Sequence, residues 1–123
     1  MSTHRPTPRA DSSLNTLFNI TYGSGSARGD LVQDDVSMGG YLVTGQEFAM
    51  VTQASSGLLR YPLSGLMGLG WQSLASSGAM PFWQRLAASG NWAEQTMGFY
   101  MKRYRNQLGA TSLESDGGEF TMG

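Results

Sequence analysis

The sequence contains no cysteine and only one histidine, His4. Without cysteine the chain can form no disulfide, no thiolate metal site and no cysteine nucleophile, and its redox compartment stays undetermined. A single histidine excludes histidine metal clusters. Because His4 lies in a polar segment, it also argues against a Ser–His catalytic system, which needs a base held by packing. We therefore expect neither a metal nor a cofactor.

Charge is also scarce, with 8 Lys and Arg against 9 Asp and Glu. Phosphate binding needs a clustered excess of Lys and Arg, so we expect no nucleic-acid partner. No apolar run approaches the roughly 20 residues of a membrane span. The first residues lack the apolar core of a signal peptide, so we expect no targeting sequence in the chain as written.

Glycine, in contrast, is abundant, with 17 residues in 123. Interleaved with short apolar runs, it is typical of an all-β protein with many tight turns. We expect a polar N-terminal segment over residues 1–16 and a folded part over 17–123. A helix is predicted over 80–90, ended by Gly90, with a further helical turn at 91–95. Strands are predicted over residues 17–22, 27–38, 41–43, 47–53, 66–70, 97–104 and 118–122.

Several motifs follow one another in an order that resembles the N-terminal lobe of pepsin-like aspartic proteases. The hairpin Ile20-Thr21-Tyr22-Gly23-Ser24-Gly25-Ser26 resembles the flap of that family, which covers bound substrate. Ser64-Gly65-Leu66-Met67-Gly68-Leu69-Gly70 resembles its hydrophobic-hydrophobic-Gly segment. The resemblance covers roughly residues 18–123. It implies an incomplete acid-protease lobe, mainly β with one or two short helices, of closed, barrel-like architecture.

The resemblance also implies roles for individual residues. Tyr22 would be the flap tyrosine that closes over a bound peptide, while Gly23 and Ser24 would offer backbone hydrogen bonds to it. Leu66 would line the primary specificity pocket. The simpler alternatives are a hairpin tyrosine packed on its own strand and a core leucine. The implied partner is a peptide or protein substrate, in an acidic secreted or vacuolar compartment.

The catalytic carboxylates of the family, however, have no counterpart here. Aspartic proteases use two carboxylates that share one proton around a water molecule, each from an Asp-Thr-Gly or Asp-Ser-Gly turn. No aspartate of this sequence is followed by either dipeptide. Asp34 and Asp35 are neighbours on a predicted strand, so they point to opposite sides unless a bulge intervenes. We expect the first motif upstream of Met1, the second in a lobe that this chain lacks, and no catalytic residue within it.

Two hypotheses follow for the function. The chain is part of an aspartic endopeptidase and inactive alone, or it is a non-catalytic peptide-binding or interaction module; an unrelated glycine-rich β-barrel is a weaker alternative.

The resemblance also bears on stability. In the family, the strand that carries the catalytic turn pairs with strands that are kept here. Without that strand, an edge and apolar surface would be exposed, which predicts marginal stability or self-association through strand edges. Asn19-Ile20-Thr21 matches the N-glycosylation pattern, which also arises by chance.

Overall fold

The computed structural model describes residues 16–60, 63–110 and 116–123; His4 and most of the N-terminal segment lie outside these ranges. The described part of the chain is mainly β, as predicted, with one α-helix, α1 (Phe82–Ser89), and a 3-10 turn, Gln72–Leu74. Its strands are β1 (Leu17–Tyr22), β2 (Gly25–Met38), β3 (Tyr41–Ala54), β4 (Met97–Met101) and β5 (Gly118–Met122).

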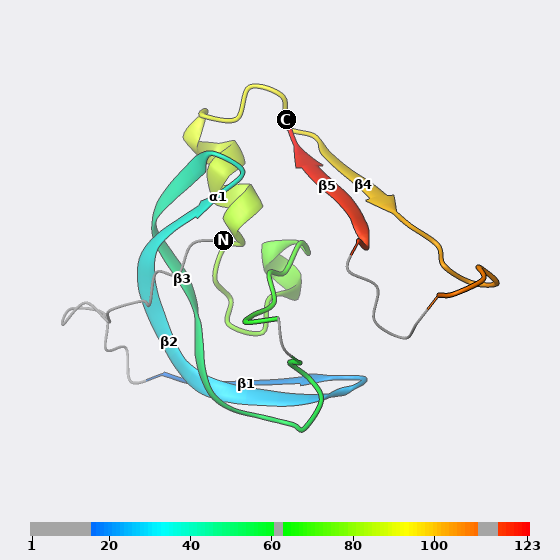
Figure 1. Ribbon diagram of the computed structural model, residues 1–123. Helices are drawn as coiled ribbons and strands as arrows, with labels where there is room; N and C mark the ends of the chain where they lie inside the picture. Colours follow the sequence, from blue (N-terminus) through cyan, green and yellow to red (C-terminus); the bar gives the residue numbers. More distant parts are fainter. Residues whose placement is uncertain (1–15, 61–62, 111–115) are drawn as a thin grey trace.

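These strands form two antiparallel sheets, one of order β1-β2-β3 and one of order β4-β5. In Figure 1, β2 and β3 make a long curved arch, with α1 against one end and β1 along the other. Neither sheet closes on itself within the described ranges, so the barrel-like closure expected from the resemblance is not formed by these strands.

The first hairpin agrees with the sequence prediction. Gly23 and Ser24 form its turn, and the register pairs Phe18 with Gly29 and Ile20 with Ala27. Gly29 and Ala27 are buried. Because side chains alternate along a strand, one face of the hairpin is apolar, and the other carries the polar pairs Asn19–Arg28 and Thr21–Ser26.

One long strand, β3, replaces the two short strands predicted over 41–43 and 47–53. Gly45 lies between those two segments with a φ of 61°, and the β2–β3 register shifts between Asp34 and Val36. Such a β-bulge lets a strand continue through a local kink. The carboxylate of Asp35 accepts a hydrogen bond from the Gly45 N–H at 2.9 Å, which fixes the kink.

Helix α1 forms where the apolar spacing predicted it. Phe82 and Leu86, one turn apart, are buried and pack with Val43 of β3 and with Trp92. Gly90 ends the helix in the left-handed conformation, with a φ of 74°, which glycine adopts without the steric cost of a β-carbon.

Three other predictions of secondary structure are wrong. Residues 66–70 form no strand, because no strand of the described ranges lies alongside to pair with them. Residues 91–95 form no helical turn, and the strand predicted over 97–104 ends at Met101. A strand needs a partner as well as a suitable composition, so apolar alternation with glycine was not sufficient.

Strands β4 and β5 form a separate ribbon with one apolar face. Its strand pairing puts Met97, Phe99 and Met101 on the same face as Phe120 and Met122. Met97 and Met122 pack against the core, whereas Phe99 and Met101 are exposed by 60% and 81%. At the far end Lys102 pairs with Asp116; this hydrogen bond lowers the pKa of Asp116 and raises that of Lys102.

The close approach of β2 and β3 at Gly29 leads to a first prediction. A β-carbon at Gly29 would collide with the backbone carbonyl of Met50, whereas one at Gly65 would meet no described atom within 4 Å. We expect Gly29→Ala to lower the free energy of unfolding by about 1–3 kcal/mol and Gly65→Ala to leave it nearly unchanged. Urea denaturation followed by tryptophan fluorescence measures both, and equal effects of the two variants would contradict the assigned register.

Candidate functional site

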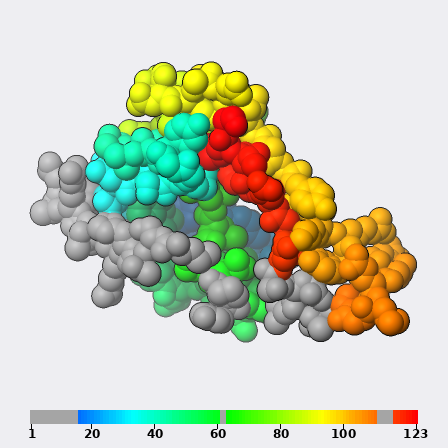
Figure 2. Space-filling model, turned by 45° about the horizontal axis from the view of Figure 1, so that its top comes forward, coloured from blue at the N-terminus to red at the C-terminus, as the bar shows by residue number. Residues whose placement is uncertain are grey.

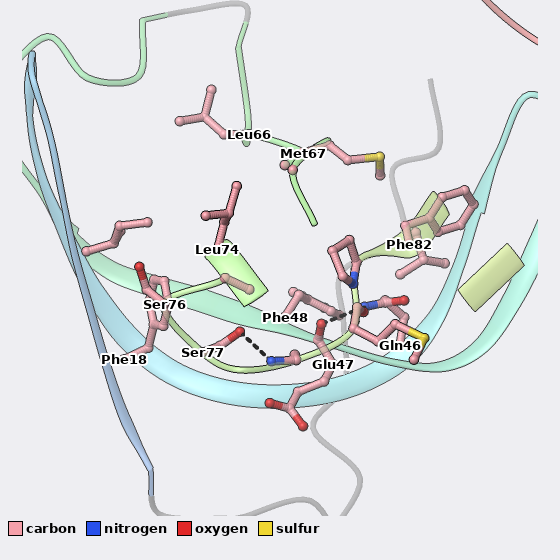
Figure 3. Close-up of a pocket in the computed structure, with 18 of the residues that line it drawn as sticks. Phe18, Gln46, Glu47, Phe48, Leu66, Met67, Leu74, Ser76, Ser77 and Phe82 are labelled. Carbon is pink, nitrogen blue, oxygen red and sulfur yellow. Dashed lines mark hydrogen bonds between the residues drawn. The ribbon is translucent and has the colours of Figure 1, made fainter. Parts of the chain in front are cut away.

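A cavity of about 900 Å³ lies between the concave side of the β1-β2-β3 sheet and the segment that leads into α1. Figure 3 shows side chains from β1, from β3 and from residues 66–82 converging on this space. Figure 2 shows that the molecule is also hollowed between that segment and β5, although no residue of β5 belongs to the lining of this cavity. The large apolar side chains that line the cavity are Phe18, Ile20, Phe48, Leu66, Met67, Trp71, Leu74, Met80 and Phe82.

Two of the residues singled out in the sequence line this cavity. Tyr22 lies at the end of β1, and Leu66 lies in the segment that precedes α1. Their side chains are 40% and 59% exposed, so both surfaces are open to a ligand. Gly23 and Ser24 form the exposed hairpin turn and are not part of the lining. Asn19 lies on the opposite face of β1, because Phe18 and Ile20 face the cavity.

One polar residue of the lining was missed by the sequence analysis. Gln46 is only 5% exposed, and its Nε2 donates hydrogen bonds to the carbonyl oxygens of Glu47, at 2.8 Å, and Met80, at 3.0 Å. The second bond joins β3 to the segment before α1 and fixes that wall of the cavity. Nothing in the local sequence distinguishes Gln46 from an exposed strand residue, because its burial depends on the distant Met80.

Asp34 and Asp35 of β2 also line the cavity, where β2 lies opposite the bulge in β3. Asp34 Oδ1 accepts a hydrogen bond from the backbone N–H of Asp35 at 2.8 Å. Asp35 Oδ1 accepts one from Gly45. The bulge lies in β3 and not in the strand that carries the two aspartates, because Thr44 and Gly45 together oppose Asp35. Both carboxylates accept hydrogen bonds from backbone N–H groups at this point. In Figure 3 the carboxylate of Glu47 points away from the apolar side chains.

The segment around Gly70 and Gln72, which forms one wall of the cavity, is attached to α1 by polar contacts. Trp83 Nε1 donates to the carbonyl oxygen of Gly70 at 3.0 Å, and the backbone N–H of Gln72 donates to Gln84 Oε1 at 2.6 Å. The rings of Trp71 and Trp83 meet edge to face with centroids 4.7 Å apart. These contacts orient the 3-10 turn and thereby place Leu74 over the cavity.

The lining of the cavity is suited to binding a polypeptide. Its surface combines mainly apolar side chains with the tyrosine Tyr22, the serine hydroxyls and the acidic residues Asp34, Asp35 and Glu47, which suits an extended, mainly apolar polypeptide. In the described ranges no group of His, Cys, Asp or Glu could hold a metal ion. Likewise, no helix of the described residues is long and apolar enough to cross a bilayer.

Comparison with known proteins assigns the family. A family model described as eukaryotic aspartyl protease matches residues 4–116. Among similar proteins, Major aspartyl peptidase 1 of Cryptococcus neoformans is 58% identical over 106 residues, which are 86% of this chain and 22% of that protein. Renin of Canis lupus familiaris is 35% identical over 97 residues, covering 76% of this chain and 23% of renin.

A third relative, Pregnancy-associated glycoprotein 1 of Ovis aries, is 31% identical over 93 residues, 76% of this chain and 24% of its own length. The chain therefore spans about a quarter or less of these relatives. The family match nevertheless covers most of the chain and agrees with the hairpin and glycine-segment motifs. On this basis the chain belongs to the eukaryotic aspartyl protease family.

Proposed function

We propose that the chain is the substrate-covering part of an aspartic-type endopeptidase, which hydrolyses peptide bonds at acidic pH with two carboxylates and an activated water. The observation that carries this proposal is that Tyr22 and Leu66, far apart in the sequence, line one apolar cavity. Both had been assigned to substrate binding from separate motifs. In this proposal residues 17–123 are a partial N-terminal lobe and residues 1–16 a polar segment before it.

In this arrangement a substrate lies extended along the cavity, with a large apolar side chain against Leu66 and Phe48. Tyr22 closes over it from the hairpin, which excludes water and orients the peptide. Gly23 and Ser24 lie at the hairpin turn next to Tyr22, so they supply backbone hydrogen bonds once the hairpin bends over the peptide. The flap is thus a short hairpin with an exposed turn, a type of element that moves at low energetic cost.

The chain supplies no catalytic carboxylate in this proposal. A dyad needs two carboxyl groups that face one water, and the carboxylates of Asp34 and Asp35 instead accept backbone hydrogen bonds within the bulge. The alternative function, a non-catalytic peptide-binding or interaction module, has no observation in its favour and stays a prediction.

We also propose a secreted or vacuolar location, in keeping with the acidic settings in which proteases of this family work. The name of the sheep relative describes a glycoprotein, which is consistent with passage through the secretory pathway. The partner would be a peptide or protein that offers large hydrophobic side chains around the cleaved bond.

The absence of a dyad predicts that the chain alone has no proteolytic activity. The purified chain, incubated with an unfolded protein at acidic pH, should release no peptides above background, with or without pepstatin. The Cryptococcus relative, prepared in parallel, serves as the active control. Pepstatin-sensitive cleavage by the chain alone would refute the assignment.

The flap role of Tyr22 is testable in a chimera. Replacing the matched segment of the Cryptococcus relative with this chain should preserve pepstatin-sensitive activity. Tyr22→Ala in that chimera should then lower kcat/KM by about 100-fold, because the flap no longer positions the substrate. Tyr22→Phe, which keeps the ring, should lower it less.

The control for that experiment is Tyr100→Ala, which removes an exposed tyrosine that is not part of the cavity lining. It should leave kcat/KM unchanged. Similar losses for Tyr22→Ala and Tyr100→Ala, or a folded chimera without activity, would count against a flap in this chain.

The chain alone should also self-associate. Within the described ranges β1 pairs only with β2, and β4 only with β5, so each leaves an open edge. Phe99 and Met101 extend the apolar face of the β4–β5 ribbon beyond the core. Open edges next to exposed apolar side chains favour pairing with another chain.

Sedimentation at increasing protein concentration measures this association. We expect a rising proportion of oligomers, which Phe99→Lys lowers because it places a charge on the apolar face of the ribbon. Tyr100→Lys, on the opposite face, should have little effect. A sharp melting transition of a monomer that does not vary with concentration would contradict the expectation.

A further inference from the structure

We propose that Asn19 is an N-glycosylation site whose glycan covers the outer face and open edge of β1 and leaves the cavity free. The proposal rests on the secretory location proposed above, since only that route supplies the sugar. The sequence pattern Asn19-Ile20-Thr21 alone is weak. Its position on the folded hairpin supplies the further argument.

Both residues that the pattern requires are accessible. Asn19 and Thr21 are exposed and share one face of β1, because they are two residues apart on a strand. Ile20, between them, faces the cavity. The acceptor amide and the hydroxyl that marks it for the transferase are thus presented together to solvent.

The cross-strand surroundings of Asn19 are polar. Its cross-strand neighbour is Arg28, and Asp30 is two residues further along β2 on the same face; both are exposed. The apolar side chain next to it on this face is Leu17, which is 85% exposed, so a hydrated glycan here displaces no buried side chain. Phe18 and Tyr22, on the other face, stay available to a ligand of the cavity.

A glycan on β1 would hinder a second chain from pairing with the open edge of this strand. Within the described ranges β1 is the outer strand of its sheet, and an unpaired edge is a template for pairing with a second chain. A large, solvated group attached at the middle of a six-residue strand blocks that approach sterically, as charged residues or prolines do on other edges.

The chemistry is a group transfer from a lipid-diphosphate-linked oligosaccharide. The Asn19 Nδ2 forms a bond to the anomeric carbon of the sugar, and the bond from that carbon to the diphosphate oxygen breaks. The amide loses one proton, and the lipid diphosphate leaves with the electron pair. No oxidant or reductant is required.

The test is secretion of the full chain from yeast behind a cleaved leader peptide, followed by enzymatic removal of N-glycans. We expect a mobility shift on deglycosylation and, by mass spectrometry of the peptide that contains it, conversion of the Asn19 amide to a carboxylate. Asn19→Gln and Thr21→Ala should both abolish the shift, whereas Thr21→Ser should retain it in part.

Leu108→Thr provides the matched control, because it creates a second N-glycosylation pattern that begins at Asn106. Asn106 and Leu108 lie in a turn region and are both exposed. Sugar at Asn106 with none at Asn19 would overturn the proposal, independently of the protease assignment. The proposed effect on the edge has its own readout. Deglycosylation should shift the secreted chain toward larger oligomers in sedimentation, and an unchanged distribution would refute that part.

Discussion

The link between helix α1 and the bulge in β3 is the contact on which the arrangement of the cavity depends. The two terminal nitrogens of Arg85 each donate a hydrogen bond at 3.0 Å, to the carbonyl oxygens of Gly45 and Thr44. On the other side, the Gly45 N–H donates to the carboxylate of Asp35. A single kinked peptide segment is thus held between a cation and an anion. Hydrogen bonds to charged groups contribute about 1.5–3 kcal/mol each, enough to maintain a strand irregularity.

The consequences of this link extend to the functional surface. Because the kink is held at Gly45, the next residue, Gln46, is turned inward and bonds the carbonyl of Met80. Met80 leads into α1, whose Phe82 is both a core residue and part of the cavity lining. The bulge, the core and the cavity wall are therefore connected through Gln46 and Phe82.

How much the sequence could predict depended on whether an element is determined locally. The first hairpin was predicted almost to the residue, because glycines at its turn and alternating residues in β1 carry enough local information. Helix α1 was predicted for the same reason, from the spacing of Phe82 and Leu86 and from the stop at Gly90. These features need no distant partner.

The wrong or missed predictions concern residues whose secondary structure or burial depends on residues far away in the sequence. Residues 66–70 have the composition of a strand, but strand formation needs a neighbouring strand. The continuity of β3 through Gly45 depends on Asp35 and Arg85, which lie on other elements. The burial of Gln46 likewise follows from Met80. Family resemblance selected Tyr22 and Leu66, but only the folded chain brings them to one cavity and adds Gln46.

The same alternation that makes the hairpin amphipathic separates its two proposed uses. With a period of two residues, Phe18, Ile20 and Tyr22 must all share the cavity side, and Asn19 and Thr21 must share the other. A one-residue slip of β1 would reverse both sets at once, bringing the glycan pattern into the cavity and the aromatic rings into solvent. The turn at Gly23 and Ser24 disfavours that slip, so the pairing that places Tyr22 at the cavity also places Asn19 on the opposite, exposed face.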